Sequence, residues 1–413
     1  MSIDYMNNKD SKYKAFNGFI FCGSASIGVM KAGFALEKVL EISEDMEKQN
    51  AYHFKKNFND IPLIKPSEWE NQTYLENMKK LDYDFSAFNC PCSSLSQINR
   101  QASVDGKNNV HFYRVFNIIK QTKPKTFLIE NAPTLIKLGY PILKDMFKEL
   151  GDDYKFTIIR DYAGNHGVAM KRMRTLIVGW RRDVFNNKIP LVHMSKQQTV
   201  TIKDAIGDLY NVPLNSDKVK NFNILNDKWD EIDLYDKVPQ NTSMLLALLE
   251  KYDEIKDEIK DESILNEVKR AKEKLDTKKR IWDKTHWRTA EKNQCPSMTS
   301  MTKLIHPINN RSFTIREYAR LMNYPDDFEF FPEECETDII QCIAQGVPAN
   351  FVKYIANEVK EALDGNREFV EDSEDKLLCF EYNTQKVYKA YTEEELNEMT
   401  CLDSDKTFKK LKK

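Results

Sequence analysis

Two cysteines, Cys90 and Cys92, flank Pro91 in the stretch NCPCSSLSQ, directly after the apolar residues 85–88. Four chemical roles fit such a pair: a metal clip, a disulfide, buried packing, or a nucleophilic thiolate. A thiol at the end of a strand, followed by small polar residues, lies where the amino terminus of a helix or turn can lower its pKa. A buried, inert cysteine is the commoner explanation for any single thiol. The residues around this stretch must therefore decide between these roles.

Three charged residues also fall at ends of predicted strands. Glu130 ends the apolar run in KTFLIENAP, where a carboxylate is costly unless it is paired or functional. Arg172 and Arg174 alternate in MKRMRTLIVGW, and alternate residues of a strand share one face. Either arginine alone could be an exposed basic strand end. A thiol, a carboxyl and two arginines at one sheet edge are harder to explain by packing.

Short apolar runs alternate with amphipathic segments through the first half of the chain, which predicts a doubly wound, mostly parallel α/β sheet. Ligands of such sheets bind at the carboxyl ends of the strands, where Gly23, Glu41, Cys92 and Glu130 all fall. The predicted strands are 18–23, 39–43, 82–91, 125–131, 156–160 and 174–180, and the predicted helices include 28–34, 111–121 and 141–150.

The turn FCGSAS and the acid Glu41 together favour a nucleoside-containing cofactor. The turn would let the backbone approach the ligand, and the carboxylate at the next strand end would hold a ribose diol. A plain tight turn and a surface acid remain the alternative for these residues taken alone.

Composition excludes several classes of protein. With 413 residues, 41 % of them hydrophobic, the chain can bury a core and divide into two or three domains. The net charge of −2 offers no general attraction to phosphate, so any nucleic-acid surface must be local. No CxxC pair, no histidines at ligand spacing and no secretory signal are present, so we expect no metal and a cytoplasmic location. No run reaches the roughly 18 apolar residues of a membrane span, so we expect no membrane partner.

In this order, the motifs resemble the cytosine C5 DNA methyltransferase family of bacteria and phages. FCGSAS…AGF resembles its donor-binding motif, VLEIS the ribose-holding motif, and NCPCSSLS the Pro-Cys nucleophile loop. IENAP and MKRMRTLIVG resemble the Glu-Asn motif and the motif with two arginines, and the likeness extends over residues 311–330 and 343–359. The resemblance covers residues 16–360. It implies a Rossmann-like methyltransferase domain with a second, smaller target-recognition domain.

The resemblance also implies a role for each residue. Cys92 would add to C6 of cytosine, Glu130 would contact N3, and Arg174, beside Arg172, would hold O2. The methyl donor would be S-adenosylmethionine, and the partner a specific duplex DNA whose cytosine is flipped out of the helix. The donor-site residues would be Phe21, Gly23, Ser26, Glu41, Ile42, Pro91, Val110, Gln345 and Val347. The DNA contacts would be Ser93, Ser96, Asn99, Arg100, Trp287 and Arg288.

The family pattern also predicts how the chain divides. The catalytic domain would span 14–185 and be completed by 336–365, and target recognition would occupy 186–335. Within the latter, the charged segment 241–280 predicts a solvated helix or helical hairpin. Residues 366–413 lie outside the resemblance, and their pattern predicts a small hairpin followed by a helix. We expect a monomer, with a cognate restriction endonuclease as an optional partner.

Several residues depart from the family pattern. Glycines are usual where Ala25, Ser26, Phe88 and Asn89 stand, glutamine is usual at Ser93 and Met170, and Gly-Asn is usual at Ala344 and Gln345. The stretch 63–69 also offers no clear aspartate to read the adenine of the donor. An altered donor pocket is therefore one hypothesis. Two further alternatives are a tRNA-modifying enzyme, disfavoured by the lack of a Cys-Phe-Thr-Tyr signature, and a catalytically silent DNA-binding homologue.

Overall fold

The computed structural model describes residues 7–19, 21–42, 52–96, 101–224, 234–277, 279, 286–298, 304–330, 339–382 and 387–402. The chain forms two compact units. The first unit comprises Met1–Val168, Arg172–Gln198 and Gln345–Lys413, and the second comprises Ala169–Lys171 and Thr199–Ala344.

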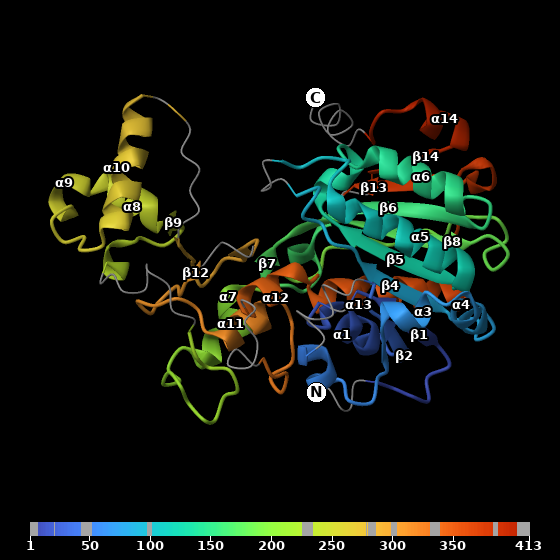
Figure 1. The fold of residues 1–413 in the computed structure, drawn as a ribbon, viewed down its shortest axis with the longest axis horizontal. Helices are drawn as coiled ribbons and strands as arrows, with labels where there is room; N and C mark the ends of the chain where they lie inside the picture. Colours follow the sequence, from blue (N-terminus) through green and yellow to red (C-terminus); the bar gives the residue numbers. More distant parts are fainter. Residues whose placement is uncertain are drawn as a thin grey trace. The chain divides into compact units, whose positions relative to one another are not determined.

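A nine-stranded sheet in the order β14-β13-β6-β8-β5-β4-β1-β2-β3 is the centre of the first unit (Figure 1). Strands β3, β2, β1, β4 and β5 run parallel, and β8 lies antiparallel between β5 and β6. This arrangement confirms the predicted Rossmann-like α/β class. The strands are β1 Lys14–Gly18, β2 Ala35–Leu40, β3 Leu63–Ile64, β4 Phe85–Asn89, β5 Thr126–Asn131, β6 Tyr154–Tyr162, β8 Met173–Arg181, β13 Leu378–Tyr382 and β14 Val387–Tyr391.

Two groups of helices pack against this sheet. One group contains α4, α5 and α6, each of which packs on the next, and the other contains α1 and α13. Gly28 permits the close approach of α1 to α13, because a Cβ there would lie 2.5 Å from the Ala349 carbonyl oxygen. The helices of the first unit are α1 Ser24–Lys31, α3 Pro66–Trp69, α4 Gln72–Lys79, α5 Val110–Thr122, α6 Tyr140–Leu150, α13 Ala349–Leu363 and α14 Glu393–Glu398.

The first strand lies earlier than predicted. β1 ends at Gly18, so the prediction of a strand over 18–23 was wrong. Phe19 and Phe21 have positive φ values of 60° and 37°, and Gly23 has φ 85°. Extended strand has negative φ, so these residues form the turn between β1 and α1 although they are apolar. The donor-site candidates Phe21 and Gly23 therefore lie in that turn.

The carboxyl-terminal hairpin and helix are confirmed and extend the main sheet. β13 pairs with β14 in antiparallel fashion and with β6 in parallel, with Leu378 opposite Phe156. Leu378 and Phe380 are buried in the same apolar cluster as Phe156. The segment outside the family resemblance thus belongs to the core of the first unit.

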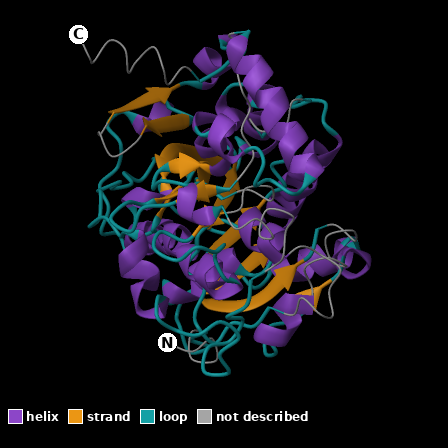
Figure 2. Ribbon diagram, turned by 90° about the vertical axis from the view of Figure 1, so that its left-hand side faces the viewer, coloured by secondary structure: helices purple, strands orange, loops and turns teal. Residues whose placement is uncertain are grey.

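Short elements make up the second unit, and each strand among its described residues has two residues. Figure 2 shows the helices of the protein in purple and its strands in orange. The predicted helix or helical hairpin over 241–280 is helical in the structure, with α8, α9 and α10 among its described residues. α8 and α10 pack together through an apolar cluster that includes Leu248 and Val268. The elements are β7 Met170–Lys171, β9 Thr242–Ser243, β10 Trp287–Arg288, β11 Cys295–Pro296, β12 Leu304–Ile305, α7 Ile202–Ile206, α8 Met244–Glu250, α9 Tyr252–Ile255, α10 Glu262–Asp276 and α11 Ile315–Leu321. The next helix, α12 Ile339–Gln345, ends at the first residue of the last segment of the first unit.

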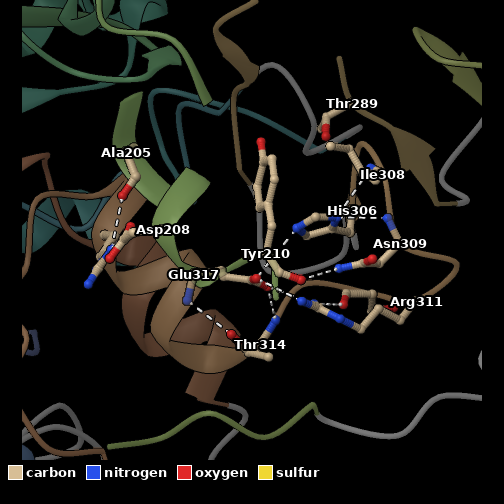
Figure 3. A network of polar contacts seen from close by, with 12 residues as sticks. Ala205, Asp208, Tyr210, Thr289, His306, Ile308, Asn309, Arg311, Thr314 and Glu317 are labelled. Carbon is tan, nitrogen blue, oxygen red and sulfur yellow. Dashed lines mark hydrogen bonds and ion pairs between the residues drawn. The ribbon is translucent and has the colours of Figure 1, made fainter. Parts of the chain in front are cut away.

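A buried ion pair at the start of α11 organises this unit (Figure 3). Arg311 binds both carboxylate oxygens of Glu317 at 2.8 Å, and Glu317 also accepts the backbone N–H of Thr314. His306 lies 3.6 Å from Glu317, yet burial, reinforced by Arg311 and Arg288, lowers the pKa of His306 to about 3. The block 311–330 is therefore a structural element of the second unit.

Candidate active site

The predicted catalytic residues Glu130 and Arg174 come from the adjacent strands β5 and β8. Asn89, the last residue of β4, is paired in register with Glu130, and Cys92 follows it by three residues. Arg174 is the second residue of β8, the strand on the other side of β5. The end of β4 and its neighbouring strands thus bring these residues to one region of the sheet.

Glu130 is a buried carboxyl, 4 % exposed, with a partner at each oxygen. Arg174 Nε lies 2.7 Å from Glu130 Oε1, and the Asn89 side-chain amide donates to Oε2. Burial raises the pKa of Glu130, while the charges of Arg174 and Arg172 oppose that rise. The carboxyl is therefore oriented on both sides and holds a proton at higher pH than an ordinary glutamate.

Arg172 and Arg174 contact different parts of the site. Its guanidinium is buried, and Nη2 donates to the carbonyl oxygen of Gly346 at 3.0 Å. Arg172 therefore binds the segment after α12, where the donor-site candidates Gln345 and Val347 lie. Arg174 forms the ion pair with the carboxyl of Glu130.

The two cysteines occupy different environments. Cys90 is 1 % exposed, and burial raises the pKa of its thiol well above the ordinary value, with further contributions from Glu130 and Cys92. Cys92 is half-buried and begins a tight turn, in which the Leu95 N–H donates to its carbonyl oxygen at 3.0 Å. Of the two thiols, Cys92 is the one accessible to a reactant.

The loop after Cys92 is anchored at its base. Asn108 donates from its backbone to Ser94 Oγ at 3.3 Å and from its side chain to Ser93 Oγ at 2.5 Å. Ser93 is exposed and Ser96 is half-buried, whereas the candidates Asn99 and Arg100 lie outside the described residues. The described part of the loop therefore keeps one exposed hydroxyl next to Cys92.

Helices fix the backbone around Glu41 and Ile42. Glu41 is fully buried, the Trp69 indole N–H donates to its carbonyl oxygen at 2.6 Å, and Arg114 donates to that of Ile42 at 2.7 Å. Beside them, a hollow of about 510 Å³ is lined by Trp69, Arg114 and the half-exposed Val110. The three donor-site candidates Glu41, Ile42 and Val110 are thus close to one another.

Orphaned polar atoms test whether this end of the sheet suits a polar cofactor. Ser24 Oγ, at the start of α1, and Gln345 Oε1 are buried and have no hydrogen-bond partner among the described residues. Ser26, the predicted contact, is instead bound by Asn17 Nδ2 at 3.3 Å. Buried polar atoms are usually satisfied, so Ser24 and Gln345 fit a ligand with hydrogen-bonding groups. Sequence reasoning missed Ser24, although it lies in the quoted turn.

Pro91 and Val347 are both buried in the first unit, and the Val347 N–H donates to Asn89 Oδ1 at 3.3 Å. Sequence reasoning noted Asn89 only as a departure from glycine and did not predict its contacts. The sequence feature that could have indicated these contacts is the asparagine itself, an amide side chain in place of glycine next to a catalytic motif.

Arg288 is buried in the structure, and its expected contact with DNA stays a prediction. It is 5 % exposed, and its guanidinium donates to the carbonyl oxygens of His306 and Tyr235 and to Asn310 Oδ1. These bonds engage Nη1 and Nη2 within the second unit. Trp287 is half-buried and keeps an accessible edge.

Neither a membrane-spanning helix nor a metal-binding group is found in the described part of the chain. No helix there has the length and apolar character needed to cross a bilayer. Among the same residues, no group of three or more histidine, cysteine, aspartate or glutamate side chains could hold a metal ion.

Comparison with known proteins agrees with this geometry. The family model for C-5 cytosine-specific DNA methylases matches residues 17–361. The type II methyltransferase M.Sau96I of Staphylococcus aureus is 24 % identical over 372 residues, covering 86 % of this chain and 78 % of the relative. M.FnuDI of Fusobacterium nucleatum, also a type II methyltransferase, is 25 % identical over 382 residues, covering 88 % and 99 %.

Solved structures show the same fold. A protein of E. coli, described as a DNA modification methyltransferase encoded within a prophage, matches with a TM-score of 0.57 and 21 % identity. The alignment covers 86 % of this chain and all of that one. The methyltransferase EhMeth of Entamoeba histolytica matches with a TM-score of 0.51 and 14 % identity, covering 87 % of this chain.

The sheet order and the strand-end residues define a methyltransferase of the Rossmann-like class. The family match extends over most of the chain, and the chain belongs to the C-5 cytosine-specific DNA methylases.

Proposed function

We propose that the protein transfers a methyl group from S-adenosylmethionine to C5 of a flipped-out cytosine in a specific duplex DNA sequence, through a covalent bond between Cys92 and C6. One observation carries this proposal: Glu130 is buried and held by Arg174 beside the strand end that leads to the accessible Cys92.

Cys92 would start the reaction. C5 of cytosine is a weak nucleophile, and addition of a thiolate to C6 moves electron density onto C5 and toward N3. Cys90 is unsuited to this step because burial raises the pKa of its thiol well above the ordinary value. The half-buried Cys92 is therefore assigned as the nucleophile.

Glu130 and Arg174 would stabilise the charge that this addition creates. Burial raises the pKa of Glu130, which favours a carboxyl that can present a proton to N3. Arg174 pairs with Glu130 through Nε, and its guanidinium has further N–H donors for the ring oxygen O2.

The donor would be held at the ends of β1 and β2. Glu41, Ile42 and Val110 would surround its nucleoside, while Ser24 and Gln345 would satisfy its polar groups. When bound, S-adenosylmethionine supplies an electrophilic methyl group. The turn at Phe21 and Gly23 would position it, with Pro91 and Val347 as further members of the site.

DNA recognition is assigned to two parts of the chain. The target base must leave the helix at a cost of roughly a few kcal/mol, and the loop from Ser93 through Ser96 and onward would close over it. The second unit would read the target sequence, with Trp287 as one contact. The catalytic domain would then include residues 366–402 through the hairpin that extends its sheet.

The type II names of the relatives suggest a biological setting. The protein would methylate the sites that a cognate restriction endonuclease cuts. It would act as a monomer, since one chain contains every proposed catalytic residue. Its proposed location is the cytoplasm.

A methyl-transfer assay tests the proposal. The protein is incubated with S-adenosylmethionine labelled in its methyl group and with either duplex DNA or tRNA, and Cys92→Ala is run beside it. Label in 5-methylcytosine of DNA, lost on substitution, is the expected result. Label in tRNA would identify an RNA-modifying enzyme, and no label in either would indicate a silent homologue. Calorimetry with S-adenosylmethionine separates an altered donor pocket from a normal one.

A further inference from the structure

Asn89 links the catalytic carboxyl of Glu130 to Val347 of the proposed donor site. Its side chain is 3 % exposed and makes two hydrogen bonds of opposite sense. Nδ2 donates to Glu130 Oε2, and Oδ1 accepts the backbone N–H of Val347 at 3.3 Å. A carboxylate only accepts and a backbone N–H only donates, so these two partners fix the orientation of the amide.

We propose that Asn89 is a positioning residue for methyl transfer, which orients the carboxyl of Glu130 and couples it to the segment 345–347. This inference rests on the proposed role of Glu130. The usual residue at this position is glycine, which has no side chain to make either contact.

The geometry of Glu130 explains what Asn89 adds. Arg174 holds Oε1 from one side, and a single contact leaves the carboxyl free to rotate about its terminal torsion. Asn89 holds the other oxygen, so the plane of the carboxyl is set before the base arrives. A proton or hydrogen bond directed at the cytosine ring requires this preorganisation.

The second contact closes a loop of interactions. Arg172 donates to the Gly346 carbonyl oxygen at 3.0 Å, and the next residue, Val347, donates to Asn89. The segment 345–347, assigned to the donor, is therefore fixed by Arg172, which directly precedes β8, and by Asn89 of β4. A shift of this segment would be transmitted to Glu130 through a single amide.

Charged and titratable groups around Glu130 come from two elements. Arg174 of β8 and Arg172, which directly precedes β8, contribute positive charge, and Cys90 and Cys92 follow β4. Asn89 contributes a neutral donor, which favours the ionised carboxyl without adding charge. Replacement by aspartate removes that donor and adds a like charge, with almost no change in shape.

Three substitutions separate positioning from packing. Asn89→Asp keeps the acceptor for Val347 and removes only the donor to Glu130. Asn89→Ala removes both contacts, and Asn89→Ser restores a short O–H donor. Thr157→Val is the matched control, because it removes the buried hydrogen bond from Trp180 on β8 without contacting Glu130.

Single-turnover methyl transfer with saturating DNA and S-adenosylmethionine is measured from pH 5.5 to 9, together with thermal unfolding at each pH. We expect Asn89→Ala to lower the rate about 10- to 100-fold and Asn89→Ser to recover part of the loss, with the KM for DNA nearly unchanged. For Asn89→Asp the alkaline fall of the rate should move to higher pH than in the wild type, because two adjacent carboxylates raise each other's pKa and keep Glu130 protonated. Thr157→Val should react at the wild-type rate.

Two results would overturn the inference: rates within twofold of wild type for Asn89→Asp, or a pH-independent deficit that follows the loss of thermal stability. Trapping on DNA containing 5-fluorocytosine keeps this test separate from the proposed function. If the wild-type protein forms no covalent complex, the proposed function fails. If it does and the Asn89 variants equal it in rate, only the inference fails.

Discussion

Arg174 Nε lies 2.7 Å from Glu130 Oε1 at the end of the central sheet, and Glu130 is buried while Arg174 is half-buried. Two effects act on the carboxyl in opposite directions. Burial raises its pKa, and the positive charges of Arg174 and Arg172 oppose the rise. The balance leaves the pKa of Glu130 above its ordinary value, which suits a group that donates a hydrogen bond or a proton to N3.

Glu130→Gln should lower the rate of methyl transfer by about 10² to 10³-fold, because an amide keeps the shape but cannot supply a proton. Binding of DNA should change little. In the wild type the protonated form of Glu130 is the active one, so the rate should fall as pH rises through its raised pKa, and this alkaline limb should be absent in the variant. Single-turnover rates across pH check both. An unchanged alkaline limb in Glu130→Gln would assign that titration to another group.

Cys90→Ala should keep methyl transfer within about threefold of wild type, because the Cys90 thiol is buried and protonated. The substitution removes a small buried side chain, so the free energy of unfolding should fall by about 1 kcal/mol. Denaturant unfolding and the methyl-transfer assay measure the two effects. Loss of activity in a folded Cys90→Ala protein would show that the cysteines have been assigned in the wrong order.

Glu381 on β13 should make stability depend on pH. Burial raises its pKa to about 8, helped by Asp161 and Glu358. Between about pH 4.5 and 8 the unfolded chain loses this proton while the folded chain retains it, so the stability present at low pH is lost progressively as pH rises. Glu381→Gln should flatten this slope and stabilise the protein at pH 8 by on the order of 1–2 kcal/mol. Thermal melts of both proteins at pH 5 and 8 give the comparison, and parallel slopes would contradict it.

Glu317→Ala should destabilise the second unit by about 3 kcal/mol, because it leaves the half-buried Arg311 without its partner and removes a cap from α11. Hydrogen exchange of α11, together with thermal unfolding, reports the effect. Glu254→Ala, an exposed glutamate on α9, is the matched control and should change stability by less than about 0.5 kcal/mol. An equal loss of stability in the two variants would contradict a stabilising role of the Arg311–Glu317 ion pair.

The sequence predicts the strands that carry the site because their patterns are local. The apolar runs before Cys92 and Glu130 have the length and boundaries of buried strands, and chemistry at strand ends follows from the fold class. The first strand was misplaced for the same reason. Phe19 and Phe21 are apolar, but their positive φ values place them in a turn, which hydrophobicity alone does not reveal.

Long-range contacts are what the sequence leaves out. The bond between Asn89 and Val347 joins residues 258 positions apart, and the pairing of β13 with β6 is equally non-local. Arg288 is a basic residue of the type that often contacts DNA, yet its guanidinium donates to carbonyl oxygens inside the second unit. Such contacts depend on packing, which a one-dimensional pattern does not contain.

The most direct test of the central claim is covalent trapping on duplex DNA that contains 5-fluorocytosine, with S-adenosylmethionine present. Fluorine at C5 blocks the final loss of a proton, so a thiol bonded to C6 stays attached. We predict a complex that survives denaturing electrophoresis for the wild type and for Cys90→Ala, and none for Cys92→Ala, with peptide mapping placing the bond at Cys92. A complex that forms equally well with Cys92→Ala would contradict the account.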